Sequence, residues 1–425
     1  MSSSRVFRAS RGRGLGRAPR SLPILLLLIA GSRVVGQSSR TPEAAQAPLN
    51  RPPAVEARWY DRFQIRGYGQ FRYNQIAASN PEYLCEQCDR SWGANGGLAI
   101  RRARLIVQGQ IHPHLFIYLQ PELATSLAGT NNVATLRDWY ADVGLDERNT
   151  FRVRFGQSKV PFSYEALQSS QNRVPLDRAD ATNSSVTNER DLGVFLYWAP
   201  AGIRERFRRL VADNLKGSGD YGVLALGAFN GQPLNRPEAN DELHVVARAS
   251  YPFAIGSQIL EPGLAAYRGT YVVTADQRST GVRGTPDWSY RDERVLASVA
   301  LAPKPVGLLA EWNAGRGPEF NPVTDSIETR PLRGGFATLF YAWRVGSHVL
   351  FPFVRWQAYD GAKKYERDAR RYRVRDTEVG VEWQPNPSFE LVAEWYWGVR
   401  RFEDFQRQSW QQRGRLLRLH AQFNY

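Results

Sequence analysis

The sequence predicts a transmembrane antiparallel β-barrel of about 16 strands, and three observations support this prediction. From Phe63 onward, segments of eight to twelve residues alternate apolar with polar side chains, which is the period of a β-strand. Short breaks such as 112–114 are separated by long polar connectors such as 160–191. No apolar run reaches the roughly 18 residues of a membrane-spanning helix. A closed barrel reconciles these features, because half of its side chains face a watery lumen.

The strands follow one another with the same rhythm to the end of the chain. In the first segment, Phe63, Ile65 and Phe71 share one face, while Arg66 and Arg72 lie on the other. The segments are expected near 63–73, 102–111, 115–123, 136–145, 151–159, 192–199, 221–230, 243–251, 263–273, 293–301, 306–314, 334–343, 348–357, 377–383, 389–397 and 416–425. Long connectors are expected at 78–96, 160–191, 274–292, 315–333, 358–376 and 398–415.

The last segment alternates most regularly. Leu417, Leu419 and Phe423 lie on one face, and the chain stops at the aromatic Tyr425. This segment resembles the C-terminal strand of Gram-negative outer-membrane proteins, in which a terminal aromatic residue serves as an assembly signal. A soluble β-sandwich or secreted barrel is the alternative, but 16 segments with connectors of alternating length count against it.

The N-terminus predicts export. Six Arg and no acidic residue precede the apolar run Leu22–Ala30, and a small-residue stretch follows it. This order is typical of a signal peptide, assigned to residues 1–36, whereas a buried core helix would rarely have such a flank. We assign 37–60 to a flexible periplasmic leader and 61–425 to an outer-membrane barrel. Cleavage removes seven basic residues, so the mature chain keeps 49 against 41 acidic ones.

The polar faces of the segments are rich in arginine, which predicts a cationic lumen. About 16 strands enclose an aqueous channel, and an Arg facing lipid at mid-membrane costs roughly 2–4 kcal/mol. If the apolar faces meet lipid, the lumen receives Arg66, Arg72, Arg102, Arg104, Arg152, Arg154, Arg248 and Arg268, as well as Arg294 and Arg355. Rows of guanidinium groups favour anions, although they could also merely solvate a water-filled wall.

Turn lengths predict two ion pairs across neighbouring strands. If the turn at 146–150 places Leu145 opposite Phe151, Asp142 faces Arg154. The turn at 112–114 likewise places Arg104 opposite Glu122. Such pairs would hold the guanidinium groups in place without neutralising the wall completely.

Five motifs in this order resemble the phosphate-selective porin family, porins O and P. They are IRRARL at 100–105, LRDWYAD at 136–142, FGQSKVPF at 155–162, ERDLGV at 189–194 and GAFNG at 227–231. The resemblance implies a 16-stranded barrel, usually a homotrimer, with the third long loop folded into the pore.

The resemblance also implies where the pore narrows. On this sequence the third long loop covers about 160–191, with Lys159 at its entrance and Arg173 and Arg178 within it. The chain has only five Lys, fewer than a lysine-rich patch requires, so specificity for phosphate does not follow.

The predicted function is a passive outer-membrane channel that prefers anions such as phosphate or polyphosphate. The expected partners are small anions, outer-membrane lipid and lipopolysaccharide, and further copies of the chain in a homotrimer. Two alternatives stay open: a weakly selective general porin, and a surface-binding barrel with an occluded pore. The basic run at 363–375 could attract anions, bind lipopolysaccharide or simply be solvated.

The remaining motifs do not indicate other chemistry. Cys85 and Cys88 lie in the first long connector of an exported protein, where a small disulfide is favoured over a redox or metal role. We find no catalytic, metal-binding or cofactor-binding motif, so the sequence predicts no enzyme and no cofactor. The arginines are spread along strands rather than gathered on one helix, which argues against nucleic acid as a partner.

Overall fold

The computed structural model describes residues 58–79, 96–124, 133–232, 234–408 and 410–425. The predicted signal peptide, nearly all of the predicted leader, and Cys85 and Cys88 lie outside the described residues. The assignment of these parts of the chain therefore stays a prediction.

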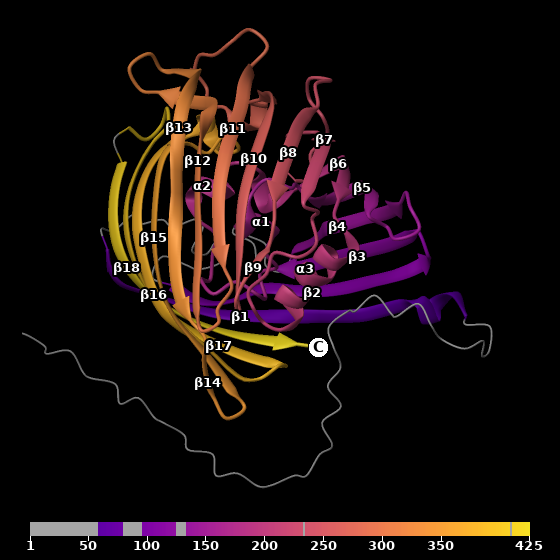
Figure 1. Cartoon of the computed structure of the whole chain (residues 1–425). Helices are drawn as coiled ribbons and strands as arrows, with labels where there is room; N and C mark the ends of the chain where they lie inside the picture. Colours follow the sequence, from indigo (N-terminus) through magenta and orange to yellow (C-terminus); the bar gives the residue numbers. More distant parts are fainter. Residues whose placement is uncertain (1–57, 80–95, 125–132, 233, 409) are drawn as a thin grey trace, which may run out of the picture. The chain divides into compact units, whose positions relative to one another are not determined.

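A single antiparallel sheet closes on itself to form a barrel (Figure 1). Its strands are β1 (Phe63–Ser79), β2 (Gly96–His112), β3 (Leu115–Ala124), β4 (Val133–Gly144), β5 (Phe151–Lys159), β6 (Arg190–Trp198), β7 (Leu224–Phe229), β8 (His244–Ser250), β9 (Phe253–Ile255), β10 (Gln258–Val272), β11 (Ser289–Leu301), β12 (Val306–Asn321), β13 (Ser326–Tyr341), β14 (Trp343–Val345), β15 (His348–Ala362), β16 (Arg371–Asn386), β17 (Phe389–Glu403) and β18 (Trp410–Asn424).

Two short strands continue the wall strand before them: β9 continues β8, and β14 continues β13. β8 and β9 both pair with β10, and β13 and β14 both pair with β15. The described residues therefore form a barrel of 16 strands, and the predicted fold class is confirmed.

The ends of the chain close the barrel. β1 pairs with β18 along its length, beginning with Tyr68 opposite Asn424. Next to this pair, Gly67 and Tyr425 exchange two backbone hydrogen bonds of 2.7 and 3.0 Å. A Cβ atom at Gly67 would fall 2.3 Å from the carbonyl oxygen of Arg104, so only glycine fits there. Closure gives every wall strand two hydrogen-bonded neighbours, as a bilayer requires.

The two faces of the wall have opposite chemistry. Large apolar side chains such as Leu264, Val295 and Leu226 are more than half exposed on the outer face. Charged side chains such as Arg355 and Arg418 are fully buried on the inner face. None of the helices in the described part of the chain is long and apolar enough to cross a membrane.

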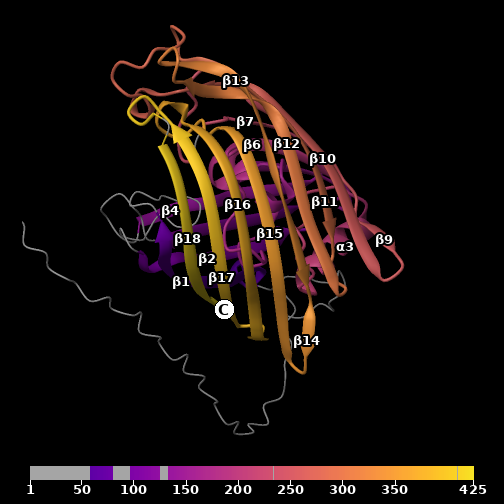
Figure 2. The same cartoon turned by 90° about the vertical axis from the view of Figure 1, so that its left-hand side faces the viewer.

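Several strands extend further than the alternation predicts. The expected connector 315–333 is mostly paired strand, because β12 runs to Asn321 and β13 begins at Ser326. The expected connector 358–376 is likewise shortened by β15 and β16. Apolar alternation stops at these positions although pairing continues, so the sequence pattern placed the strand ends too early. The long strands β12, β13 and β15–β18 stand side by side in Figure 2.

Four consecutive strands, β5–β8, are short, and we call them the low wall. They have six to nine residues each, whereas β10–β13 and β15–β18 have 13 to 16. The difference in height is visible in Figure 1.

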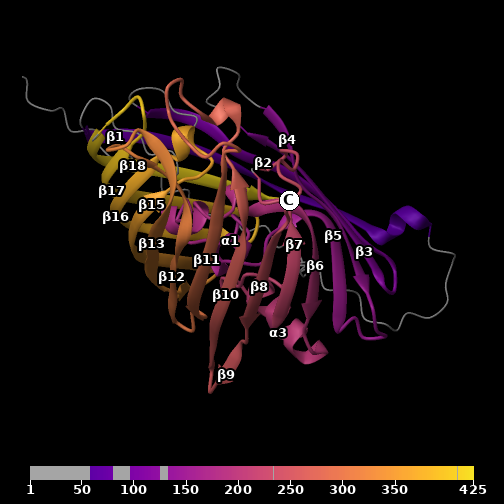
Figure 3. The ribbon, with the colours of Figure 1, turned by 90° about the horizontal axis from the view of Figure 1, so that it is seen from above.

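Two segments connected to the low wall fold into the barrel. The inner loop, residues 160–189, contains α1 (Tyr164–Leu167), α2 (Asp180–Asn183) and the 3-10 turn η2 (Thr187–Glu189). The position of this loop agrees with the prediction. Seen from above, α1 lies inside the ring of strands (Figure 3). Short 3-10 turns also occur at η1 (Trp59–Arg62), η3 (Ala275–Gln277) and η4 (Arg367–Ala369).

The second segment, residues 199–223, was not predicted, and we call it the rim insert. It joins β6 to β7 at the end of the barrel where the other connections are short turns, and it contains α3 (Ala201–Ala212). Ile203, Phe207 and Leu210 form the buried face of α3 and pack against Ala302 and Ile259 of the wall. The spacing of these helix residues, four and three positions apart, is typical of a helix, but a search for strand alternation does not detect it.

Replacing Phe207 with Ala should loosen α3 from the wall. Phe207 is only 1% exposed, and removing a buried Phe side chain costs about 3–5 kcal/mol. We expect a lower temperature for loss of heat-resistant electrophoretic mobility and a higher single-channel conductance. The matched control is Arg209→Ala on the exposed face of the same helix. Equal behaviour of the two variants would show that packing of α3 does not shape the lumen.

Candidate pore and its charged lining

The inner loop is fixed to the tall side of the barrel by a shared carboxylate. Asp177 of the loop accepts from Arg418 at 2.6 Å, from Arg72 at 2.8 Å and from Arg101 at 3.4 Å. Arg72 and Arg418 are completely buried in this contact. One acid therefore holds three cations and ties the loop to β1, β2 and β18.

Further ion pairs anchor both helices of the inner loop. Glu165 of α1 accepts from Arg355 of β15 at 2.8 Å. Asp180 of α2 accepts from Arg400 at 2.8 Å and from Lys363 at 2.7 Å. Since each partner on the wall is almost completely buried, the loop is held from several strands at once.

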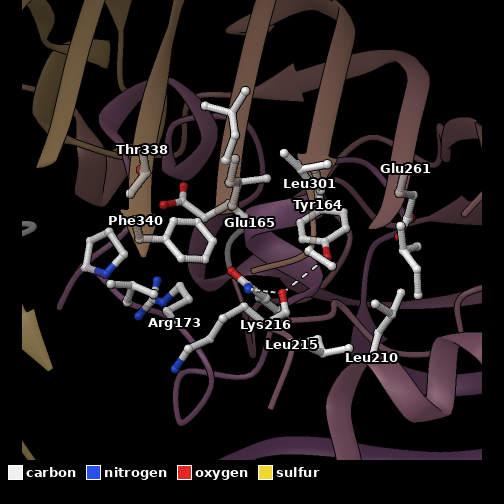
Figure 4. Close-up of a pocket in the computed structure, with 18 residues that line it drawn as sticks. Tyr164, Glu165, Arg173, Leu210, Leu215, Lys216, Glu261, Leu301, Thr338 and Phe340 are labelled. Carbon is white, nitrogen blue, oxygen red and sulfur yellow. Dashed lines mark hydrogen bonds between the residues drawn. The ribbon is translucent and has the colours of Figure 1, made fainter. Parts of the chain in front are cut away.

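The rim insert supports the inner loop from below. Lys216 of the insert pairs with Glu382 of β16 at 2.6 Å. The carbonyl oxygen of Lys216 accepts hydrogen bonds from the Tyr164 hydroxyl at 3.2 Å and from the Gln168 side chain at 2.5 Å (Figure 4). Only about 20 Å³ of free space remains beside this contact. The two segments together fill the lumen on the side of the tall strands.

Open space remains on the opposite side, as a cavity of about 500 Å³. It runs from the short-turn rim, at His114 and Arg148, to the inner loop at Ser169 and Asn172. The cations of the lining are Arg66, Arg104, Arg148, Arg152, Arg154, Lys159, Arg190, Arg204 and Arg208, and its acids are Asp138, Asp142, Glu205 and Asp220. Within the described residues, positive groups of this lining outnumber negative ones by about two to one.

Both ion pairs that the turns predict are present. Arg154 lies opposite Asp142 and donates to its two carboxylate oxygens at 2.6 and 2.8 Å. Arg104 lies opposite Glu122 and pairs with it, and Glu122 also accepts from Arg137 at 2.7 Å. These pairs fix the guanidinium groups on the wall, and Glu122 again serves two cations.

The same sharing occurs near the short-turn rim. Asp220 of the rim insert accepts from Arg152 of β5 at 2.8 Å and from Arg204 of α3 at 2.9 Å. Arg66, Arg148 and Lys159 have no acidic partner within 4 Å among the residues that the structure describes. The Lys159 amine instead donates to the carbonyl oxygens of Leu167 and Gln168, at 2.7 and 2.8 Å.

Aromatic rings stiffen one part of the lining. The Arg154 guanidinium lies 3.8 Å from the centre of the Tyr140 ring, and the Tyr118 ring stacks on the Tyr140 ring with their centres 5.0 Å apart. Tyr197 and Tyr221 also lie within 5.5 Å of the same guanidinium. Since it contacts these rings and binds both oxygens of Asp142, Arg154 is held in one orientation.

Five predicted residues point inward but do not line this cavity. Arg72 binds Asp177 of the inner loop, Arg102 donates to Gln70 at 2.8 Å, and Arg248 pairs with Glu261 at 3.2 Å. Arg178 pairs with Glu189 inside the loop. Among the described residues, Arg173 donates only to the carbonyl oxygen of Leu176, at 3.3 Å, and two of its nitrogens are buried without a partner.

The structure does not support the inward placement of Arg268. It lies on the exposed face of β10 together with Leu264, while Tyr267, on the opposite face, is 3% exposed. The two faces of this segment are both rich in apolar residues, with Ala265 and Tyr267 on one and Leu264 and Ala266 on the other. Alternation therefore could not tell which face meets lipid.

Sequence reasoning also missed part of the lining. Arg204 and Arg208 come from α3, whose helical spacing was overlooked, and Arg148 lies in a turn. Arg190 stands in the motif at 189–194 but was not assigned to the lumen; it donates to both oxygens of Asp138 at 2.9 and 3.0 Å. Within the described residues, no group of three His, Cys, Asp or Glu side chains could hold a metal ion.

The electrostatics of the inner loop keep Asp177 and Glu189 charged. Burial alone would raise the pKa of Asp177, but the guanidinium groups of Arg72, Arg101 and Arg418 hold it well below its usual range. Arg178 and Arg190 lower the pKa of Glu189 in the same way. Burial and the charge of Arg173 lower the pKa of Arg178 to about 9, so this group stays cationic at neutral pH.

A family model described as phosphate-selective porin O and P matches residues 84–425. A comparison with curated protein sequences finds no match.

Solved structures of outer-membrane channels share the fold. The DcaP channel of Acinetobacter baumannii matches with a TM-score of 0.54 and 14% identity, covering 85% of this chain and 97% of that one. OmpF of Salmonella typhi, in complex with daunomycin, matches with a TM-score of 0.52 and 12% identity over 85% and 97%. The trimer form of OmpT of Vibrio cholerae matches with a TM-score of 0.50 and 9% identity, covering 86% of this chain and 100% of that one.

Replacing Asp177 with Asn should release the inner loop, because three cations, two of them fully buried, would lose their shared acid. Since the folded-state pKa of Asp177 is depressed, its stabilising effect is complete above the ordinary carboxyl pKa of about 3.9 and is lost as pH falls further. We expect unchanged thermal stability of the native barrel from pH 8 to about pH 5, a decrease below about pH 4, and a lower stability of the variant throughout the upper range. A variant as stable as the native barrel at pH 7 would contradict this anchoring role.

Proposed function

This chain belongs to the phosphate-selective porin O and P family and is an outer-membrane porin, and on that premise we propose that it conducts small anions in preference to cations. The observation that carries the proposal is the excess of cations over acids around the open cavity. A positive, narrow, water-filled passage lowers the energy of an anion and raises that of a cation.

Phosphate-like anions suit this lining best among small anions. Guanidinium groups offer pairs of parallel donors that match phosphate and carboxylate oxygens. Arg66, Arg148 and Lys159 lack acidic partners in the described part of the chain, so their charges are available to a passing anion. The groups that acids hold in place, such as Arg154, provide fixed positive charge between them.

The proposed constriction lies where the inner loop meets the wall. The Ser170 hydroxyl of the loop lies 2.6 Å from the Tyr68 hydroxyl, and Arg104 Nη1 donates to it at 3.3 Å. Lys159 holds the C-terminal end of α1, at Leu167 and Gln168, against β5. Arg102 and Arg173 are the further cations that we place beside this narrowing, and neither has an acidic partner within 4 Å among the described residues.

The low wall supports assembly into a homotrimer. A strand rises about 3.3 Å per residue and tilts by about 40°, so strands of six to nine residues cover roughly 15–23 Å along the membrane normal. The apolar band of a barrel is about 25 Å tall. Strands β5–β7, which no further strand continues, are therefore too short to face lipid alone, and other copies of the chain covering them would remove the mismatch.

Reversal potentials in planar bilayers test the proposal. With a gradient of potassium chloride across the membrane, the reversal potential of an anion-preferring channel has the same sign as the equilibrium potential of chloride. Added phosphate should then reduce the chloride current, because the two anions compete for the same cations. Cation preference at neutral pH would refute the proposal, and an absence of conductance would favour the alternative of an occluded, ligand-binding barrel.

Arg66→Glu is the variant that tests anion selectivity most directly. Arg66 lines the cavity without an acidic partner within 4 Å among the described residues, so reversing its charge should lower the anion-to-cation permeability ratio several-fold. Arg268→Glu is the matched control, because Arg268 lies on the outer face. The expected result is a changed ratio for the first variant and the native ratio for the second. If both variants keep the native ratio, Arg66 does not contribute to selectivity.

A further inference from the structure

A group of exposed arginines lies on the outer face of three neighbouring strands, and we call it the outer arginine cluster. Its members are Arg373 and Arg375 on β16, Arg401 on β17, and Arg413 and Arg415 on β18. The side chains of Arg373 and Arg401 are 54% and 46% exposed.

Strand alternation shows that the cluster points away from the lumen. Tyr372 and Val374, which flank Arg373, are buried, as is Arg400 beside Arg401. The Arg400 guanidinium reaches into the barrel and binds Asp180 of the inner loop at 2.8 Å. The cluster is therefore separate from the proposed anion passage.

The cluster borders the apolar outer surface at the long-connector end of the strands. Arg415 is paired with Trp397, and Val399 is paired with both Arg375 and Arg413. Trp397 and Val399 are exposed on the same face. In an outer-membrane barrel, long loops lie at the extracellular side and aromatic residues mark the interface, so these arginines lie at the level of the outer-leaflet headgroups.

Two members of the cluster carry a charge that no acid pairs with among the residues that the structure describes. Arg373 and Arg401 lie directly opposite each other on neighbouring strands, and an acidic side chain beside each one offsets the repulsion between these like charges. Asp360 lies 3.4 Å from Arg373, and Glu403 lies 2.7 Å from Arg401. Arg375 and Arg415 have no acidic partner within 4 Å among the described residues, and Arg375 donates only to the backbone, at 2.6 Å and 3.4 Å.

Arg291, Arg316 and Arg333 are also exposed on the outer face of the tall strands β11–β13, whereas the strands beside the open cavity do not share this chemistry. At the same end of β2, β3, β4 and β6, the exposed outer side chains include Leu98, Leu123, Val133 and Leu192. The positive charge is thus concentrated on the tall side of the barrel, opposite the low wall. A general need for solubility would not produce this one-sided distribution.

We infer that the outer arginine cluster binds the phosphate groups of a phosphorylated glycolipid in the outer leaflet. Guanidinium forks match phosphate oxygens, and neighbouring strands are about 4.8 Å apart, so Arg375 and Arg413 stand roughly 10 Å apart across Val399. This spacing suits a headgroup with more than one phosphate. Trp397 and Val399 then contact the beginning of the acyl chains. The site goes beyond the proposed channel activity and requires only the outer-membrane location.

The test compares lipid binding by the full mature protein and by Arg375→Gln/Arg415→Gln. Both side chains are exposed, and neither has an acidic partner in the described residues, so the double variant should fold. The probe is bis-phosphorylated lipid A in phosphatidylcholine nanodiscs, with phosphatidylcholine alone as the reference. Arg344→Gln is the matched control, because Arg344 is exposed on β14 near the short-turn rim.

The expected result is lipid A binding that is at least fivefold weaker in the double variant and native in Arg344→Gln. Heat-resistant mobility and chloride selectivity should be native in all three proteins. Equal lipid A binding by the double variant would overturn the inference, and so would native protein that binds lipid A no more tightly than phosphatidylcholine. If the double variant binds free tripolyphosphate more weakly than the native protein does but binds lipid A equally well, the cluster is a site for soluble anions and the inference is overturned.

Discussion

The closure of the sheet between β1 and β18 is the constraint on which the rest of the structure depends. In lipid, an unpaired strand edge would expose backbone groups to a medium that cannot hydrogen-bond them. The contacts between Gly67 and Tyr425 complete the ring. Once the ring is closed, alternation along each strand divides the side chains into an apolar outer surface and a charged inner one, and every charged group inside must find water or a partner.

Inside the barrel, one acid commonly serves several cations. Asp177, Glu122 and Asp220 each bind two or three arginines, and Asp180 binds an arginine and a lysine. Because each shared acid fixes two or three cations but neutralises only one charge, the side chains are ordered and the lumen keeps a net positive charge. The same groups therefore do two things: they anchor the inner loop and rim insert on the tall side, and they leave a positive field on the open side.

The asymmetry of the wall links assembly, conduction and lipid contact. The inner loop and the rim insert both connect to strands of the low wall, yet their anchors, such as Arg355, Arg400 and Glu382, lie across the lumen on tall strands. The open cavity consequently remains beside β2–β6. The exposed arginines of β16–β18 lie on the other side of the barrel, where the strands are tall enough to reach the headgroup region.

The sequence by itself determined the barrel, its 16 strands and two cross-strand pairs, because alternation with period two and short turns are local features that fix register. The folding of the inner loop into the lumen was implied by the resemblance to the porin family and not by the strand pattern. The alternation misplaced Arg268, since β10 is apolar on both faces, and it overlooked α3. Only the tertiary structure decided which inward arginines line open space. Arg72 and Arg154 carry the same signal in sequence, but contact with Asp177 buries the first against the inner loop, whereas Arg154 lines the cavity. That difference arises from residues more than 100 positions apart along the chain, which strand periodicity cannot report.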